Sequence, residues 1–502
     1  MEIIKAKIPE RIIKNTSTCK YNNTSTDIEK LQEDILKCYD KKSTVILVGQ
    51  VQSGKTKFVI DLIYKALYNE KFNFDAIVYF SGLNNELNNQ ALERFKNENL
   101  FGNVVSSKDL EGLNNTRKIV IVSIKQKDNL RLITNFLANN SSEIEKILIV
   151  DDESDYGAIN SKSKEDSYNN KCGPIYKEIY NDMYRMCGNS GGFLKLTATP
   201  FVDILTEKDI YKTNEPYLFS IPTNDNYTGV KFFNNLDENF WYPIIKDNNY
   251  EPYNIENAKK DVVNAFFLWV YKSYLLFQDK TVPNFNKSDL LINIFNKVKY
   301  HKIICNILAN YVYMKINTFK QEMKIALNEE MKFNLNDEMI NEIYNFYFDN
   351  IKANNIELVE FNRNKDSNKT LDKNYNVIVG GNLLSRGKSF ENLLCELIVI
   401  KEKSQLTYDT LLQKCRWFGY RKPRAKYMTL ICNERIKNKL KEIELIINMF
   451  HDGNYGHCLD YREILNTLRK HSEMIFDNEY YSNKGKIKYA KRTKTIHHRG
   501  YR

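Results

Sequence analysis

Residues 49–56 read Gly-Gln-Val-Gln-Ser-Gly-Lys-Thr, which is the spacing of a loop that holds a triphosphate. A β-branched apolar run precedes the loop, and a segment with helical periodicity follows it. In this order the glycines let backbone N–H groups curl round the phosphates, and the helix N-terminus faces the anion. The lysine is expected to be catalytic, because it neutralises the terminal phosphates. The threonine offers its hydroxyl to Mg²⁺. The residues expected to bind the nucleotide are Gly49, Gln52, Ser53, Gly54, Lys55 and Thr56.

An acidic run, residues 151–155, directly follows four apolar residues that predict a buried strand. In a parallel sheet the carboxyl end of that strand falls beside the phosphate loop. We expect Asp152 to hold Mg²⁺ through water and Glu153 to orient or deprotonate the attacking water. An acidic cluster after a strand is usually a solvated turn, but a complete phosphate loop upstream favours the catalytic interpretation.

Residues 196–200, Leu-Thr-Ala-Thr-Pro, end the next expected strand. The hydroxyls of Thr197 and Thr199 can hydrogen-bond the acidic pair and report whether a γ-phosphate is present. As an isolated peptide, the same segment predicts only a turn.

Two arginine-containing segments, residues 380–387 and 413–421, lie in the second half of the chain. The planar, permanently charged guanidinium group stabilises a transferring phosphoryl group when it is supplied from across a cleft. Taken by itself, an arginine in such a segment is more often a partner in a surface ion pair.

The elements that must position these residues alternate between strands and helices, which predicts a parallel sheet with helices on both faces. The alternation breaks and then resumes, as a duplicated nucleotide-binding fold would produce. The expected strands are residues 44–48, 76–80, 118–124, 147–150 and 193–197, then 290–295, 356–361, 377–379, 396–400 and 427–431.

The expected domains follow from these breaks. They are an N-terminal extension with a helix (1–40), a first α/β domain (41–225), a linker or insertion (226–285), a second α/β domain (286–435) with a helical insertion (301–354), and a helical end with a basic tail (436–502).

The composition is that of a globular protein, with 42% hydrophobic and 27% charged residues and a formal net charge of +11. The basic excess suits a polyanionic partner without requiring one. The nine cysteines form no C-x-x-C pair and indicate reduced thiols in a cytosol-like compartment. The longest apolar run, residues 265–271, is too short to span a bilayer, and the N-terminus has no signal-peptide core. We therefore expect a soluble cytoplasmic protein without a membrane partner.

The five motifs occur in the order found in superfamily-two helicases, which this chain resembles. More narrowly, residues 49–56, 151–155, 380–387 and 416–421 resemble the Z-one domain family. That family comprises helicase-like ATPases that are often labelled putative endonucleases and linked to bacterial conflict systems. The similarity runs from about residue 40 to 435, and Arg-Trp-Phe-Gly-Tyr-Arg at 416–421 is its highly specific part.

The resemblance implies two tandem RecA-like domains of the P-loop NTPase class, each a doubly wound parallel sheet, with ATP and Mg²⁺ in the cleft between them. It implies that Arg386 and Gly387 bind the nucleotide, that Gln413 joins the catalytic residues, and that Arg416 or Arg421 is the arginine finger. The family usually has glycine where Cys415 stands, and ordinary helicases space the two arginines by three residues rather than five. Which arginine touches the γ-phosphate is therefore open.

In such a motor, the loops that follow the strands of both halves contact nucleic acid. We expect Ser81, Gly82, Lys125 and Lys388 to meet backbone phosphates, of DNA rather than RNA. Such contacts are independent of base sequence and sensitive to salt. Proteins of a defence system are expected as further partners because of the resemblance.

Three functions follow from these motifs. The first is a hydrolase of acid anhydrides, an ATP-dependent helicase-like motor acting on nucleic acid. The second is an endonuclease, or the motor subunit of a nuclease complex, although no acidic trio suited to a nuclease stands out. The third is a nucleotide-gated switch that unwinds no strand. His451, His457 and His471, with Cys458, lack the spacing of metal ligands and are expected in the helical end.

Overall fold

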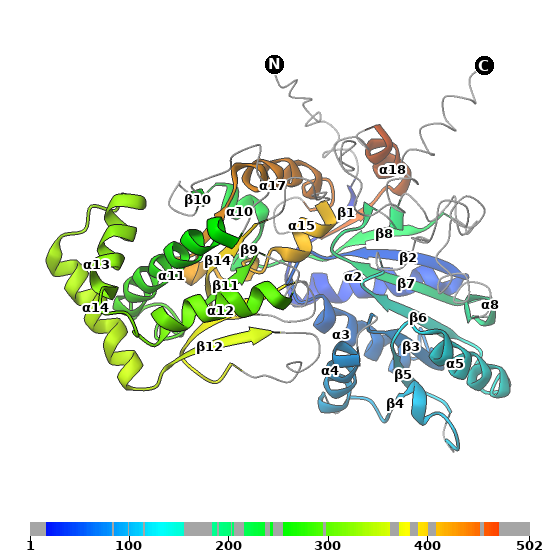
Figure 1. Cartoon of the computed structure of the whole chain (residues 1–502). Helices are drawn as coiled ribbons and strands as arrows, with labels where there is room; N and C mark the ends of the chain where they lie inside the picture. Colours follow the sequence, from blue (N-terminus) through cyan, green and yellow to red (C-terminus); the bar gives the residue numbers. More distant parts are fainter. Residues whose placement is uncertain are drawn as a thin grey trace, which may run out of the picture. The chain divides into compact units, whose positions relative to one another are not determined.

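The computed structural model shows a mixed α/β protein with two compact units (Figure 1). Unit 1 comprises residues 1–225 and 445–502, and unit 2 comprises residues 226–444. The structure describes residues 17–82, 85–98, 100–113, 116–154, 183–187, 190–201, 203–204, 215–235, 241–243, 255–294, 298–361, 371–381, 390–399, 408–451 and 456–470.

The sheet of unit 1 has the strand order β1-β17-β8-β2-β7-β6-β3-β5-β4. From β8 to β4 neighbouring strands are parallel, whereas β17 runs antiparallel to both of its neighbours. The strands are β1 (Ser17–Tyr21), β2 (Ser43–Val48), β3 (Ala76–Phe80), β4 (Asn103–Ser106), β5 (Ile119–Ser123), β6 (Ile147–Asp152), β7 (Gly191–Thr197), β8 (Tyr217–Ser220) and β17 (Gly456–Leu459).

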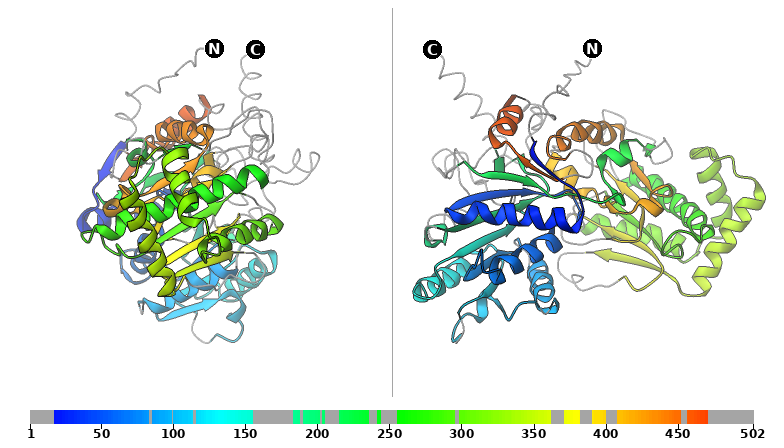
Figure 2. Two further views of the ribbon diagram at one scale, coloured as in Figure 1. Left: turned by 60° about the vertical axis from the view of Figure 1, so that its left-hand side comes forward. Right: turned by 180° about the vertical axis from the view of Figure 1, so that it is seen from behind.

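Helices cover both faces of this sheet, because its central strands are apolar on both sides. Ile77 and Tyr79 of β3 pack in one core with helices α2 (Ser25–Lys37), α3 (Lys55–Tyr68) and α4 (Asn85–Asn97). Val78 and Phe80 of the same strand pack on the opposite face with α5 (Lys127–Asn139). Figure 2 shows α2 lying along the sheet in its right-hand view. Unit 1 is therefore a largely parallel sheet between two helical layers.

The first unit also contains short elements and a returning C-terminal segment. The short helices are η1 (Cys38–Asp40), η2 (Ser107–Asp109) and α8 (Tyr184–Met186). The C-terminal region, expected to be helical, contributes the strand β17 as well as helix α18 (Tyr461–Lys470). Within the described residues, no helix is long and apolar enough to cross a membrane.

Unit 2 has a six-stranded, fully parallel sheet of order β10-β16-β14-β11-β13-β12. Its strands are β10 (Trp241–Pro243), β11 (Ser288–Asn293), β12 (Ile356–Phe361), β13 (Tyr375–Gly380), β14 (Leu393–Ile398) and β16 (Thr429–Cys432). A separate pair, β9 (Tyr227–Thr228) and β15 (Gly419–Tyr420), is antiparallel.

Helices of unit 2 lie between β11 and β12, where a helical insertion (301–354) is expected. Helix α11 (Ile255–Gln278) packs on α12 and α14, and its aromatic side chains Phe266 and Phe267 contact Phe319 of α13. The remaining elements are α10 (Val230–Asn234), α12 (Val298–Val312), α13 (Phe319–Lys324), the π-helix η5 (Ile325–Glu330), α14 (Asp337–Lys352), α15 (Tyr408–Lys414), α16 (Lys422–Ala425) and α17 (Glu434–Ile447).

Candidate functional site

The loop between β2 and α3 curls through two left-handed residues before the helix begins. Gln52 has a φ of 57° and Gly54 a φ of 82°, and α3 starts at Lys55. The N–H group of Gly49 donates to the carbonyl of Thr197 at 3.0 Å, which fixes the start of the loop on β7. The loop therefore leads its backbone directly into a helix N-terminus, the part of a helix that attracts anions.

The side chain of Lys55 folds back across this loop. Its ammonium group donates to the carbonyls of Gln50 at 3.0 Å and Gly49 at 3.4 Å. A Cβ atom on Gly49 would lie 2.4 Å from Cγ of Lys55, so only glycine leaves room for the lysine. Ser53 is buried within the loop, and Thr56 lies half-buried in the first turn of α3. The residues of unit 1 that are predicted to bind the nucleotide thus form the turn after β2 and the first two residues of α3.

The acidic turn, residues 151–154, comprises the end of β6 and the two residues after it, and in the sheet β7 lies between β6 and β2. The Asp152 carboxylate accepts hydrogen bonds from the Tyr79 hydroxyl at 2.8 Å and from the Glu153 N–H at 3.1 Å. Burial, and then the charge of Glu153, raise the pKa of Asp152 above its ordinary value. Glu153 itself has a φ of 57°, a left-handed conformation that is uncommon for a residue with a side chain.

Thr197 is the last residue of β7, the strand between the phosphate loop and the acidic turn, and Thr199 lies two residues after it. Both are buried, and the Thr197 hydroxyl accepts a 2.9 Å hydrogen bond from the Thr199 N–H group. Because the Thr197 carbonyl holds Gly49, this strand end is joined directly to the phosphate loop.

The side-chain oxygens of Thr56 and Asp152 suit Mg²⁺ as ligands. Magnesium keeps several waters and is usually held by one or two protein oxygens together with substrate phosphates. The Thr56 hydroxyl and the Asp152 carboxylate provide such oxygens, and the raised pKa of Asp152 marks negative charge that a cation would relieve. No cluster of three or more His, Cys, Asp or Glu side chains suited to a metal occurs in the described part of the chain.

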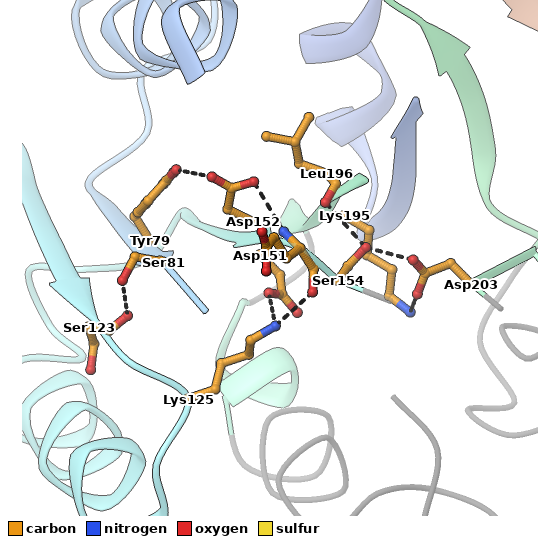
Figure 3. Close-up of polar contacts among 11 residues, drawn as sticks. Tyr79, Ser81, Ser123, Lys125, Asp151, Asp152, Ser154, Lys195, Leu196 and Asp203 are labelled. Atoms are coloured by element: carbon orange, nitrogen blue, oxygen red, sulfur yellow. Dashed lines mark hydrogen bonds and ion pairs between the residues drawn. The ribbon is translucent and has the colours of Figure 1, made fainter. Parts of the chain in front are cut away.

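Two buried ion pairs flank the acidic turn. Lys125 lies 2.7 Å from Oδ1 of Asp151, and both side chains are almost fully buried. Lys195 lies 3.5 Å from Oδ1 of Asp203, whose other oxygen accepts a 2.6 Å hydrogen bond from the hydroxyl of Ser154. Figure 3 shows these pairs on either side of the turn. Together they hold residues 151–154 from two directions.

The structure corrects the expectation for Lys125, which was placed among residues that meet nucleic-acid phosphates. Its side chain is 1% exposed and its ammonium group is paired inside unit 1, because Asp151 provides an opposite charge there. Ser81 is also buried, and its hydroxyl donates to the side chain of Asn88 at 2.9 Å. Gly82 lies two residues after β3 and has a φ of 99°. The role of Ser81 and Gly82 in nucleic-acid binding stays a prediction.

The C-terminal segment brings two histidines to the phosphate-loop side of unit 1, which the sequence did not reveal. His457 of β17 lies opposite Ser220 of β8, and Ser220 in turn lies opposite Val48, directly before the loop. Phe450 packs on Phe201, with ring centroids 6.2 Å apart. His451 follows Phe450 in the chain. Its pKa is lowered to about 3, first by burial and then by the nearby charges of His457 and Lys55. No local pattern could have signalled this placement, because it depends on pairing across more than 200 residues.

In unit 2, the guanidinium group of Arg421 bonds to backbone carbonyls of the same unit. It is buried and donates to the carbonyls of Glu391 at 2.9 Å, Phe418 at 3.1 Å and Arg416 at 3.2 Å. Burial, and then the charge of Arg424, lower the pKa of Arg421 to about 10. These contacts make Arg421 a clamp that joins the segment around residue 391 to residues 416–418.

Arg416 lies beside a buried carboxyl group that the sequence did not suggest. Burial raises the pKa of Glu396 on β14 to about 8, although Arg416 and Lys414 oppose this shift. Gln413 lies half-buried near the end of α15. Arg386, Gly387 and Lys388 lie outside the described residues, so their predicted roles stay untested.

The fold is that of a mixed α/β protein, and its turn between β2 and α3 has the sequence pattern of a phosphate loop. Residues 261–453 match the family model of the Z1 domain, the Z-one domain named above. Over this range the match confirms the similarity to the Z-one domain family that the sequence motifs indicate. The matched range contains the segments 380–387 and 416–421, whereas the phosphate loop and the acidic turn lie before it.

Among solved structures, the chain is similar to the DUF1998 helicase MrfA bound to DNA, with a TM-score of 0.41 and 12% sequence identity. The similarity covers 83% of this chain and 48% of that one, so this chain spans about half the length of that helicase. A comparison with curated proteins found no match.

Proposed function

We propose that this protein is an ATPase of the helicase type that acts on nucleic acid, with both units RecA-like. One observation carries the proposal. The phosphate loop after β2 and the acidic turn after β6 end at the same edge of one parallel sheet, separated by β7. The intervening strand leaves room between a bound phosphate and the acidic residues, as hydrolysis by water requires. Thr197 on that strand also holds the first glycine of the loop.

The proposed roles follow from the chemistry of phosphoryl transfer. Backbone N–H groups of the loop and the ammonium group of Lys55 bind and orient the triphosphate of ATP. Thr56 and Asp152 are the residues that would hold Mg²⁺, which spreads the charge of the transferring group. Glu153 would orient the attacking water or accept its proton. Tyr79 keeps the Asp152 carboxylate oriented through its 2.8 Å hydrogen bond.

Unit 2 is proposed to supply the arginine finger. The three carbonyl contacts of Arg421 commit its guanidinium group to the interior of this unit. Arg416 is equally buried and lies beside Glu396, and we carry it forward as the candidate finger, with Gln413 of α15 three residues before it. Arg386 and Gly387 remain proposed nucleotide contacts on the strength of the family resemblance alone.

Nucleic acid is the proposed effector, with DNA tested first, and the loop of Ser81 and Gly82 together with Lys388 is proposed to contact its backbone. The basic net charge of +11 supports an anionic partner. Because the contacts are proposed to be with phosphates, binding should weaken steeply as salt rises. A defence complex as a further partner rests on the family resemblance only.

The decisive experiment measures ATP turnover with and without single-stranded and double-stranded DNA and RNA. The proposal expects turnover that nucleic acid stimulates and that Lys55→Ala abolishes. Lys57→Ala is the matched control, because Lys57 is exposed on the same helix and pairs with Asp61 and Glu98. Turnover that no nucleic acid stimulates would instead indicate a nucleotide-gated switch. Plasmid cleavage that survives Glu153→Gln would indicate a separate nuclease site.

A further inference from the structure

Lys125 connects two loops of unit 1 through two different parts of the residue. It follows strand β5 and is 1% exposed. Its backbone N–H group donates to the carbonyl of Gly82 at 2.9 Å. Its side-chain ammonium group donates to the carbonyl of Glu153 at 3.1 Å and pairs with Asp151 at 2.7 Å. One buried residue therefore touches both the loop after β3 and the acidic turn after β6.

The loop after β3 is fastened to the end of β5 at several points. The N–H group of Ser81 donates to the carbonyl of Ser123 at 3.0 Å, and the Ser81 hydroxyl reaches the same carbonyl at 3.3 Å. With the bond from the Lys125 N–H group to the Gly82 carbonyl, these contacts make residues 81–82 and 123–125 one hydrogen-bonded unit. A displacement of the Gly82 loop must therefore move the backbone of Lys125.

The acidic turn depends on contacts to its backbone. Glu153 holds a left-handed conformation, which a glutamate adopts only where its surroundings impose it. The next residue is fixed by a bond from the Ser154 N–H group to the carbonyl of Leu196 at 3.2 Å and by the bond of its hydroxyl to Asp203. On the other side, the bond from Lys125 holds the carbonyl of Glu153 itself. Lys125 is thus one of the groups that set the direction of the Glu153 side chain.

The ammonium group of Lys125 cannot easily move away from this turn. Separating it from Asp151 would leave two unpaired charges in the interior, which is strongly unfavourable. A movement of the Lys125 backbone is therefore transmitted to residues 151–153 rather than absorbed by a rotation of the side chain.

We propose that Lys125 is a positioning residue that couples nucleic-acid contact at the Ser81–Gly82 loop to the placement of Glu153 for ATP hydrolysis. This inference rests on the proposed function and adds a route by which nucleic acid stimulates turnover. Lys125 touches neither nucleotide nor nucleic acid in this account. Lys125 instead affects the ratio of ATP turnover with nucleic acid (stimulated) to ATP turnover without it (basal).

The test compares Lys125→Met with Lys127→Met, which removes an exposed lysine two residues further on. Lys125→Met keeps the apolar stem and removes the ammonium group. We expect the stimulated-to-basal ratio to fall about tenfold, within the usual range of coupling between sites, while nucleotide and nucleic-acid affinities stay within about threefold of wild type. Lys127→Met should retain the full ratio.

A second variant guards against misfolding, because Lys125→Met leaves Asp151 buried without its partner. Lys125→Met combined with Asp151→Asn removes both charges and should show the same loss of stimulation. Stimulation equal to wild type in either folded variant would overturn the inference and leave the proposed function intact. A wild-type protein that nucleic acid does not stimulate would instead contradict the proposed function.

Amide hydrogen exchange on the unaltered protein gives a measurement that needs no variant. On adding single-stranded DNA, or whichever nucleic acid stimulates turnover, we expect exchange to change at residues 81–82 and also at residues 153–154. A change confined to residues 81–82 would overturn the inference, because the movement would then stop before the acidic turn.

Discussion

The hydroxyl group of Tyr79 donates a 2.8 Å hydrogen bond to the carboxylate of Asp152. Tyr79 lies on β3 and Asp152 at the end of β6, so the bond joins adjacent strands beside the proposed Mg²⁺ position. Burial, and then the charge of Asp152, raise the pKa of Tyr79 well above its ordinary value, and the hydroxyl therefore remains a donor at physiological pH. The bond orients the carboxylate without neutralising it.

Tyr79→Phe should weaken Mg²⁺ binding while leaving the fold intact. Removing the partner of a metal-ligating side chain typically costs about tenfold or more in metal affinity. We expect the Mg²⁺ concentration for half-maximal ATP turnover to rise by about that factor, as a titration would show. Tyr39→Phe is the control, because Tyr39 is an equally buried tyrosine whose hydroxyl bonds the carbonyl of Phe193. An unchanged Mg²⁺ titration in Tyr79→Phe would contradict the proposed role of Asp152.

Gly49→Ala should displace Lys55 from the phosphate loop. The new methyl group would lie 2.4 Å from Cγ and 2.6 Å from Cδ of that lysine, so the side chain must leave its path. We expect the dissociation constant for ATP to rise about tenfold, a loss of about 1.4 kcal/mol, in an equilibrium binding assay. Gly102→Ala is the matched control, since its methyl group would meet no atom within 4 Å. Equal ATP affinity in the two variants would show that the observed lysine position is irrelevant to binding.

Arg416 and Arg421 should respond differently to alanine. Arg421→Ala removes three hydrogen bonds to backbone carbonyls, two of them buried, and should destabilise unit 2 by about 3 kcal/mol, seen as a lower melting temperature. Arg416→Ala should reduce ATP turnover about a thousandfold, the lower end of the range for arginine fingers. Its melting temperature should stay closer to wild type than that of Arg421→Ala. Full turnover in folded Arg416→Ala would exclude it as the finger.

His451 should make the protein sensitive to acid. Its pKa is lowered to about 3 in the folded protein, against about 6.5 when unfolded, so below pH 6.5 the unfolded chain binds a proton that the folded protein excludes. Stability is therefore lost as the pH falls from 6.5 towards 3, by about 2 kcal/mol at pH 5 from this residue. His451→Gln should show a smaller drop in melting temperature between pH 7 and pH 5 than wild type. Equal drops would show that His451 is not held neutral by its surroundings.

Local sequence patterns predicted most of the two parallel sheets. Runs of four to six apolar residues, such as 44–48 and 147–150, became buried strands because both faces of each sheet are covered. The position of the turn between β2 and α3 was also predictable, since the glycines, lysine and threonine of its pattern lie within eight consecutive residues. Both predictions used only residues that are close together in the sequence.

Features that depend on distant residues were not predictable. A lysine after a strand looks exposed in the sequence, and only the position of Asp151, on a strand separated from β5 by β3, explains why Lys125 is buried. The pairing of β17 with β8 and β1, and the arrival of His451 near Lys55, likewise arise from chain ends far apart in sequence. The left-handed backbone at Glu153 has no sequence signal either, because glutamate rarely adopts it.

The insertion of β17 between β8 and β1 also affects how the protein is made. While the chain is synthesised, the outer edge of β8 stays without its antiparallel neighbour until residues 456–459 emerge, long after the rest of that sheet. An open strand edge is prone to pair with other chains. Unit 2, translated in between, can fold as a unit during this interval. Ribosome-bound intermediates that stop before residue 456 should therefore be the species that chaperones must shield.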